Sequence, residues 1–269
     1  MRNRSLIKKV VLMDWKAESE LFNQMADYYD TYRPSYPNDI IESIIRKSSL
    51  TADSRLLEIG SGSGKATAQF VDIGLDIICI EPGADLVEKG KKNFQDKRVT
   101  FINQRFEDYV EPHNYFDAII SAQAFHWIPQ PQGYEKCARA LKKGGKIALF
   151  WNIDIICDTE TDNAFYDILS QYNAFTSCIL EKNYNNRVKT ISSAIVESGL
   201  FLKPEIIQSF WDKNYSADEY FHYILTGQVF AQNSDEQKRD CHEKLIEYAK
   251  KHNGIQRHYV CELYIAEKK

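Results

Sequence analysis

The chain has 269 residues, of which 43% are hydrophobic and 27% charged, and its formal net charge is −4 at pH 7. These values suit a globular protein with one large domain, and the slightly acidic balance gives no reason to expect a nucleic-acid-binding surface. No apolar run is long enough to span a membrane, and the basic N-terminal segment is too interrupted for a signal peptide. The six cysteines show no C-x-x-C spacing. We therefore expect a cytoplasmic protein with neither a disulfide framework nor a metal site.

Two helices are predicted before the first strand. Residues 18–32 place apolar and aromatic side chains on one broad face, after a loose arm at residues 1–15. Pro34 and Pro37 then keep the chain extended, because proline disfavours helix in the residue before it. Asn38 is expected to cap a second helix, over Asp39–Lys47.

A glycine-rich loop follows the first predicted strand, Arg55–Ile59. Gly60, Gly62 and Gly64 stand at every second position, and the apolar pattern from Ala66 onward indicates a helix. Glycines allow a tight turn and a close approach to a ligand. The start of a helix would add unpaired N–H groups that suit an anionic group such as a carboxylate.

The spacing in this loop departs from the dinucleotide fingerprint G-x-G-x-x-G/A. Lys65 and Thr67 stand where that pattern requires small residues, and the chain reads E-x-G-x-G-x-G instead. A second strand over residues 75–80 ends at Glu81, where a carboxylate can accept both ribose hydroxyls of an adenosine. The alternative interpretation is a tight turn and a surface glutamate in an α/β protein without a ligand.

Strands and helices alternate as far as residue 151. The predicted elements are a helix over 84–94, strands over 99–103 and 116–121, a helix over 132–141 and a strand over 146–151. Beyond it lie an aromatic insertion at 153–185, a helix over 188–198, a strand over 204–215, a lid helix over 217–225, a helix over 234–251 and a last strand over 257–266.

This order predicts an α/β fold with a doubly wound, mostly parallel sheet, in which the last strand enters antiparallel. We treat residues 1–269 as a single domain with a cofactor-binding core at 37–152 and an N-terminal helical cap at 16–36. The lid or substrate segments are expected at 153–185 and 216–252.

The segments LLEIGSGSG, IICIEPG, FINQRFEDY and FDAIISAQAFHWI, in this order and spacing, resemble class I S-adenosylmethionine-dependent methyltransferases. The resemblance covers roughly residues 20–152. YDTYRPSYP and AFHW resemble the small-molecule branch that includes trans-aconitate-type carboxyl methyltransferases. The resemblance implies a Rossmann-like sheet of seven strands whose last strand is antiparallel.

The resemblance assigns S-adenosyl-L-methionine to the glycine loop. The backbone of Gly60, Ser61 and Gly62 would hold the methionine part of this cofactor. Glu58 would fix the loop by accepting its N–H groups, and Glu81 would bind the ribose.

Further family positions surround the rest of the cofactor. Pro82 would pass beneath the edge of the adenine, and the backbone of Phe106 with the neighbouring Arg105 and Glu107 would meet the ring. This branch often has a small residue and an aspartate where Arg105 and Phe106 stand. Ser121 would lie near the amino group or the sulfonium.

Tyr29, Arg33 and Tyr36 are positioned to close over the cofactor and bind an acidic substrate. The alternative is a helix end that packs on the sheet. Gln123, His126 and Trp127 follow the fourth strand and would line the acceptor pocket. His126 is the candidate general base, against the interpretation of a histidine that packs beside Trp127 and shapes the pocket.

The leading hypothesis is therefore methyl transfer to a small-molecule acceptor, at a carboxylate or a hydroxyl, by a monomer or homodimer. The competing hypothesis is a non-catalytic adenosylmethionine-binding module that engages a protein partner. A nicotinamide-dependent dehydrogenase is disfavoured by Lys65, Thr67 and the absence of a tyrosine–lysine pair after the fourth strand. A protein or RNA methyltransferase is disfavoured by the lack of an N-P-P-Y type tetrad and of a basic face.

Overall fold

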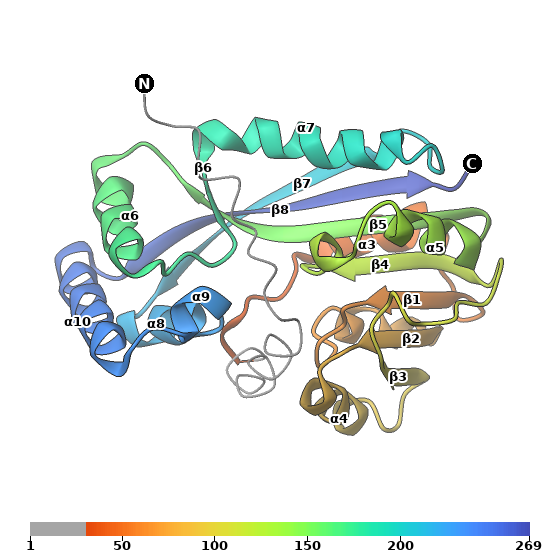
Figure 1. Ribbon diagram of the computed structural model, residues 1–269, viewed down its shortest axis with the longest axis horizontal. Helices are drawn as coiled ribbons and strands as arrows, with labels where there is room; N and C mark the ends of the chain where they lie inside the picture. The colour runs from red at the N-terminus through yellow and green to blue at the C-terminus, as the bar shows by residue number, and fades with distance from the viewer. Residues whose placement is uncertain (1–30) are drawn as a thin grey trace.

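The computed structural model describes residues 31–269, apart from the side chain of Gln228. Tyr29, the arm at 1–15 and residues 16–30 of the cap at 16–36 therefore lie outside the described residues. An eight-stranded sheet forms the centre, in the order β3-β2-β1-β4-β5-β8-β7, with β6 paired to β5 (Figure 1). The strands are β1 (Arg55–Ile59), β2 (Asp76–Glu81), β3 (Val99–Asn103), β4 (Phe116–Ala122), β5 (Leu141–Ile156), β6 (Cys178–Leu180), β7 (Glu205–Tyr215) and β8 (Ile255–Glu267).

The predicted fold class is confirmed. Strands β1 to β5 run parallel to one another, and β8 is antiparallel to both β5 and β7. The chain moves outward from β1 to β3 and then returns to the other side of β1 with β4, which makes the gap between β1 and β4 the topological switch point. The short β6, which pairs with the end of β5, is one strand more than the seven predicted.

Helices cover both faces of the sheet because its central strands are apolar on both sides. They are α3 (Asn38–Lys47), α4 (Ala84–Asn93), α5 (Gln132–Ala140), α6 (Glu160–Tyr172), α7 (Glu181–Glu197), α8 (Ala217–Leu225), α9 (Gln228–Ala231) and α10 (Asp235–His252). Helix α3 packs in the core on one face, whereas α5 and α7 belong to the core on the other. Asn38 is the first residue of α3, after Pro37, and does not cap the helix as predicted.

A second group of helices gathers where β5, β7 and β8 extend beyond β4. Helices α6, α8, α9 and α10 lie at that end of the long strands (Figure 1) and build their own apolar core, which includes Phe165, Tyr220 and Leu245. The insertion predicted at 153–185 therefore begins inside a strand, since residues 153–156 complete β5 and residues 153–155 pair with β8. Helices α6, α8, α9 and α10 form a packed unit, the helical lobe, rather than a simple cover.

The helix predicted after the glycine loop does not form. Between Gly64 and Gly74 the chain makes two 3₁₀ turns, η1 (Thr67–Gln69) and η2 (Val71–Ile73). Both glycines have positive φ, and the residues between them form only these short turns.

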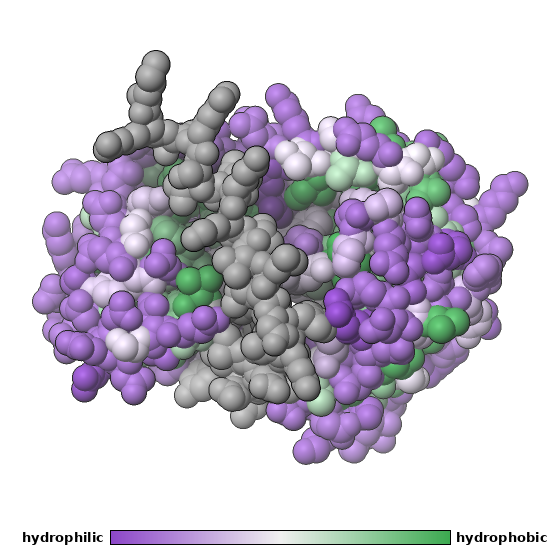
Figure 2. Space-filling model, viewed as in Figure 1, coloured by the Kyte–Doolittle hydropathy of each residue, from purple (hydrophilic) through white to green (hydrophobic). Residues whose placement is uncertain are grey.

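None of the helices within residues 31–269 combines the length and the apolarity that a membrane crossing requires. Hydrophilic side chains cover most of the described surface that Figure 2 shows, and apolar residues appear there in small, separate patches. Most of the large apolar side chains lie in the three core clusters.

Candidate functional site

A pocket opens at the carboxyl edge of the sheet, where the switch point lies. It holds about 1270 Å³ of empty space, a volume that includes open solvent at its mouth. The predicted site residues that line it are Arg33, Tyr36, Glu58, Gly60, Ser61, Gly62, Glu81, Pro82, Arg105, Phe106, Glu107, Gln123 and Trp127. Residues far apart in the sequence are thus brought to one cavity.

The glycine loop is held against the end of β2. The Gly60 N–H donates to the carbonyl of Ile80 at 2.8 Å, and Gly60 and Gly62 both have positive φ. A Cβ on Gly60 would stand 2.3 Å from the Cβ of Ala124, so the loop after β4 passes too close for any side chain. A Cβ on Gly62 would meet nothing within 4 Å, which leaves that part of the loop open.

The Glu81 carboxylate connects the glycine loop to the turn after β2. One oxygen accepts the Gly62 N–H at 2.9 Å and the other accepts the Gly83 N–H at 2.8 Å. Burial raises the pKa of Glu81, and these two hydrogen bonds oppose the rise by stabilising the charged form. Each oxygen keeps a further lone pair, so the carboxylate can still accept hydroxyl groups from a ligand.

Glu58 lies beneath the loop and is 1% exposed. Its carboxyl group accepts the Thr67 hydroxyl at 2.5 Å, and the Thr67 N–H also stabilises it. Burial raises the pKa of Glu58 to about 8, with a smaller contribution from the charge of Glu81. The side chain therefore anchors the segment just after the loop through Thr67, whereas the expectation was that it would accept N–H groups of the loop itself.

The loop after β3 forms the wall beyond Glu81. Arg105 and Glu107 pair at 2.6 Å, and Phe106 between them is buried in the core while it also lines the pocket. This geometry fixes the backbone at the position where the resemblance expects an adenine contact.

Arg33 connects the pocket to the helical lobe. Its Nε donates to the Thr226 hydroxyl at 2.8 Å and its Nη1 donates to the Ser177 hydroxyl at 3.2 Å. The Lys65 ammonium, from the glycine loop, donates to the carbonyl of Arg33 at 2.8 Å. The segment before α3 is therefore attached both to the loop and to the end of α8.

The far wall lies over β4 and β5. Tyr36 packs edge-on against Phe150, with 4.8 Å between ring centroids. Gln123 adopts φ 59°, a conformation uncommon for a residue with a side chain, and its Nε2 donates to the carbonyl of Asn152 at 2.8 Å. Trp127 is 50% exposed and borders the mouth.

His126 stands behind this wall and is not among the residues that line the pocket. The Trp151 indole N–H donates to its Nδ1 at 3.2 Å. Enclosure of the ring by its neighbours lowers the pKa of His126 to about 4, and the positive charges of Arg187 and Arg33 add to this, although the residue as a whole is exposed at the surface. A neutral ring that accepts at Nδ1 carries its proton on Nε2, which makes that atom a donor.

Ser121 is placed differently from the expectation. It is completely buried, and its hydroxyl donates to the carbonyl of Ile59 at 2.9 Å, so it braces β4 against β1 beneath the pocket.

Asn152 and Tyr223 also line the pocket, but the sequence did not identify them as site residues. Asn152 could have been found as a polar residue near the carboxyl end of a predicted parallel strand. Tyr223 carries no such signal, because only packing brings α8 to the site.

Among residues 31–269, no three histidine, cysteine, aspartate or glutamate side chains are grouped so that they could hold a metal ion. The polar groups of the pocket are instead backbone N–H groups, carboxylates, amides and the cationic side chains of Arg33, Lys65 and Arg105, which suit an organic ligand with hydroxyl and charged groups.

Comparison with known proteins finds similarity in the part of the chain that contains the glycine loop and Glu81. Residues 57–149 match a family model described as a methyltransferase domain. An uncharacterized methyltransferase of Mycobacterium tuberculosis is 30% identical over 131 residues, which are 49% of this chain and 51% of that protein. A probable S-adenosylmethionine-dependent methyltransferase of Saccharomyces cerevisiae is 29% identical over 147 residues, 52% of this chain and 50% of that protein. The chain thus spans about half the length of these curated relatives.

Among solved structures, a proposed type II methyltransferase from Anaeromyxobacter dehalogenans superposes with a TM-score of 0.61 at 17% identity, over 88% of this chain and 98% of that one. At this identity the likeness concerns the fold. The family match, in contrast, concerns the sequence, and its range of residues 57–149 includes the glycine loop, Glu81 and the loop after β3.

Proposed function

We propose that this chain is an S-adenosylmethionine-dependent methyltransferase that acts on a small-molecule acceptor. One observation carries the proposal: the hydrogen bond between Gly62 and Glu81 joins the glycine loop and the carboxylate at the switch point, on one wall of the pocket. The methyltransferase domain match includes both residues.

The residues of this wall fit the cofactor. The backbone beside Gly62 is open, as a loop that must accept a ligand requires. Glu81 keeps lone pairs for two ribose hydroxyls, and the backbone at Phe106 stands where the adenine edge would pass. The bound cofactor would supply an electrophilic methyl group on a sulfonium.

The remaining task of the protein is to orient the acceptor and to exclude water, which can account for much of the acceleration of a methyl transfer. Tyr36, Trp127 and Tyr223 provide the apolar walls for this. His126, with its donor at Nε2, is suited to hold an oxygen of the acceptor or to shape the wall.

A general base at His126 would need a free nitrogen lone pair, and the only one on the neutral ring is already used by Trp151. His126→Ala should therefore leave cofactor affinity within about threefold and raise KM more than it lowers kcat. The wild-type rate should show no step between pH 6 and 8. A step near pH 6.5 that disappears in His126→Ala would instead identify the base.

A nicotinamide-dependent dehydrogenase is less well supported. The pyrophosphate of a dinucleotide binds at the start of a helix after the glycine loop, and here the chain makes 3₁₀ turns at that place. A non-catalytic adenosylmethionine-binding module stays the alternative, because it would use the same cofactor wall.

Calorimetry with adenosylhomocysteine tests the cofactor site. Wild-type protein should bind it, and Glu81→Ala should lose about 2–4 kcal/mol of binding free energy because two charge-assisted hydrogen bonds are removed. Glu88→Gln, on the exposed side of α4, serves as the control and should bind like wild type. Equal affinity in Glu81→Ala and wild type would refute the assignment.

Turnover separates the enzyme from the binding module. Release of adenosylhomocysteine from adenosylmethionine should be measured across a panel of small carboxylates, alcohols and amines. Cofactor binding without turnover on any acceptor would favour the non-catalytic alternative.

A further inference from the structure

One polar atom in the wall of the pocket has no partner. Asn152 is 2% exposed and lines the pocket, and its Oδ1 makes no hydrogen bond within the described structure. A buried amide oxygen without a partner is costly, so such atoms are commonly satisfied by a ligand.

The orientation of this amide is determined by its surroundings. Its Nδ2 donates to the carbonyl of Ser35 at 3.1 Å, so the nitrogen must face the segment before α3 and the oxygen must face the other way. The Asn152 backbone is held as well, because its carbonyl accepts Nε2 of Gln123. The oxygen is therefore a positioned acceptor rather than a rotating one.

The place of Asn152 in the sheet separates it from the cofactor wall. The last residue pair between β4 and β5 joins Ala122 to Phe150, so Asn152 stands two residues beyond the end of β4, where β5 continues in the sheet and pairs with β8. The cofactor residues follow β1, β2 and β3, and β4 lies between those strands and β5. Asn152 thus faces the side of the pocket where the acceptor must lie.

The geometry points to Asn152 as a specificity residue that accepts a hydrogen bond, through Oδ1, from the hydroxyl or amino group of the methyl acceptor. This inference rests on the proposed methyltransferase function and narrows its substrate class. A carboxylate acceptor would set oxygen against oxygen and lose affinity, whereas a group that carries a proton is bound.

The first test is calorimetry of adenosylhomocysteine with wild type and Asn152→Ala. Affinities within about threefold of each other are expected, because Asn152 stands apart from the cofactor wall. A loss of more than about tenfold would assign Asn152 to the cofactor and overturn the inference. Failure of the wild type to bind adenosylhomocysteine would refute the proposed function itself, which is a separate result.

The second test uses benzyl alcohol, benzylamine and benzoate, three probes of one shape that suit the aromatic walls. They are titrated by ligand-observed NMR into protein saturated with adenosylhomocysteine. Wild type should bind the alcohol and the amine about tenfold more tightly than benzoate, and Asn152→Ala should lose most of this preference.

Asn152→Asp supplies the matched variant, since it keeps an acceptor oxygen and nearly the same size. It should retain the discrimination against benzoate and increase the affinity for benzylamine relative to benzyl alcohol. Thermal melts show whether each variant folds. If Asn152→Ala does not fold, the ratio of the benzylamine affinity to the benzyl alcohol affinity in Asn152→Asp decides. Three results would overturn the inference. Wild type could bind benzoate as tightly as the donor probes, or it could bind neither donor probe. The folded variants could also keep the wild-type preference for the donor probes over benzoate.

Discussion

Two glycines of the same loop meet different demands. Both have positive φ, but a side chain at Gly60 would collide with Ala124, whereas one at Gly62 would extend into open space. The conformational requirement is therefore shared, and the steric requirement belongs to Gly60 alone.

Gly60→Ala should consequently cost more stability than Gly62→Ala. For Gly62→Ala we expect about 1 kcal/mol from the left-handed backbone conformation. For Gly60→Ala the clash should add roughly 1–3 kcal/mol. Urea unfolding of both variants without ligand measures the difference, and equal losses would show that Ala124 moves aside freely.

Glu58 makes stability depend on pH in an unusual direction for an acid. Its folded-state pKa of about 8 lies above the unfolded value of 4.5. The folded state therefore binds the proton more tightly, and the associated stability is complete below pH 4.5 and is lost as pH rises through 8.

Glu58→Gln, which mimics the protonated side chain, should remove this dependence. Near pH 5 the variant and the wild type should have similar stability, and at pH 9 the variant should be more stable by a few kcal/mol at most. Thermal unfolding across this pH range is the measurement. Parallel curves for the two proteins would contradict a raised pKa at Glu58.

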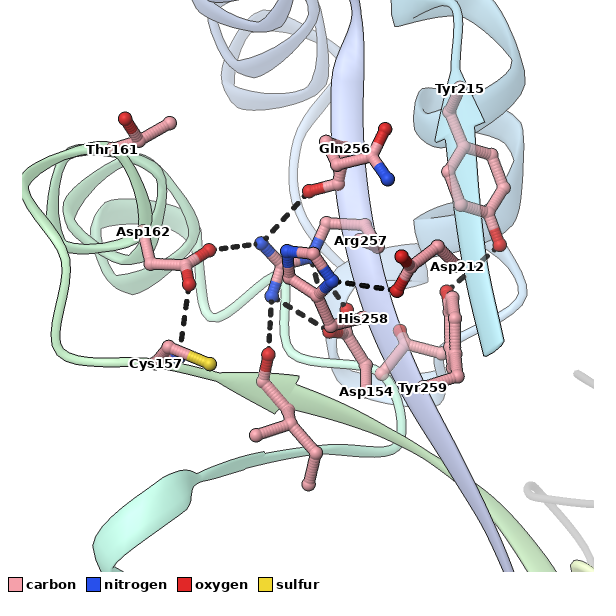
Figure 3. Close-up of polar contacts among 12 residues, drawn as sticks. Asp154, Cys157, Thr161, Asp162, Asp212, Tyr215, Gln256, Arg257, His258 and Tyr259 are labelled. Atoms are coloured by element: carbon pink, nitrogen blue, oxygen red, sulfur yellow. Dashed lines mark hydrogen bonds and ion pairs between the residues drawn. The ribbon is translucent and has the colours of Figure 1, made fainter. Parts of the chain in front are cut away.

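At the scale of elements, a buried ion cluster joins the helical lobe to the sheet. Arg257 of β8, with no exposed surface, donates to Asp154 of β5 through Nε and Nη2 and to Asp162 of α6 through Nη1 (Figure 3). Asp162 also accepts the Cys157 N–H at 3.0 Å, which holds the turn between β5 and α6. The orientation of α6 thus depends on a few charges.

Asp154→Ala should destabilise the protein by about 3–5 kcal/mol, because it leaves the Arg257 guanidinium buried with only one carboxylate. Denaturant titration gives the value. Glu88→Gln, which removes a surface pair with Lys91, should leave the urea midpoint unchanged. A midpoint shift of the same size in both variants would mean that burial does not govern the effect.

At the scale of the whole molecule, the pocket lies between the carboxyl edge of the sheet and the helical lobe. Tyr223 of α8 lines it, and Arg33 is bound to Thr226 just after α8. Residues 217–231 are therefore the part of the lobe whose order should respond to ligands.

Hydrogen exchange in residues 217–231 should slow when adenosylhomocysteine and an acceptor are both present, and less when adenosylhomocysteine is added alone. Residues 153–156, first included in the lid, should be protected throughout because they complete β5. If residues 217–231 are as protected in the free protein as the central strands, they are not a lid.

The sequence by itself determined the cofactor half of the molecule. Short apolar runs and a glycine-rich loop are local signals, and a parallel sheet then brings the ends of β1, β2 and β3 to one edge. The sequence therefore places Glu81, Gly62 and the loop at 105–107 together. The antiparallel last strand followed from the resemblance and from the long helical excursion before it.

The tertiary structure alone decided the acceptor half. Neighbours that are distant in sequence determine two side-chain orientations. They turn the Ser121 hydroxyl toward the Ile59 carbonyl rather than a ligand, and they set the direction of the Asn152 amide. Tyr223 reaches the pocket only because the helical lobe is held in position by its own core and by the ion cluster around Arg257. Local patterns specify an element and its faces, but the partner of a buried polar atom is chosen by long-range packing.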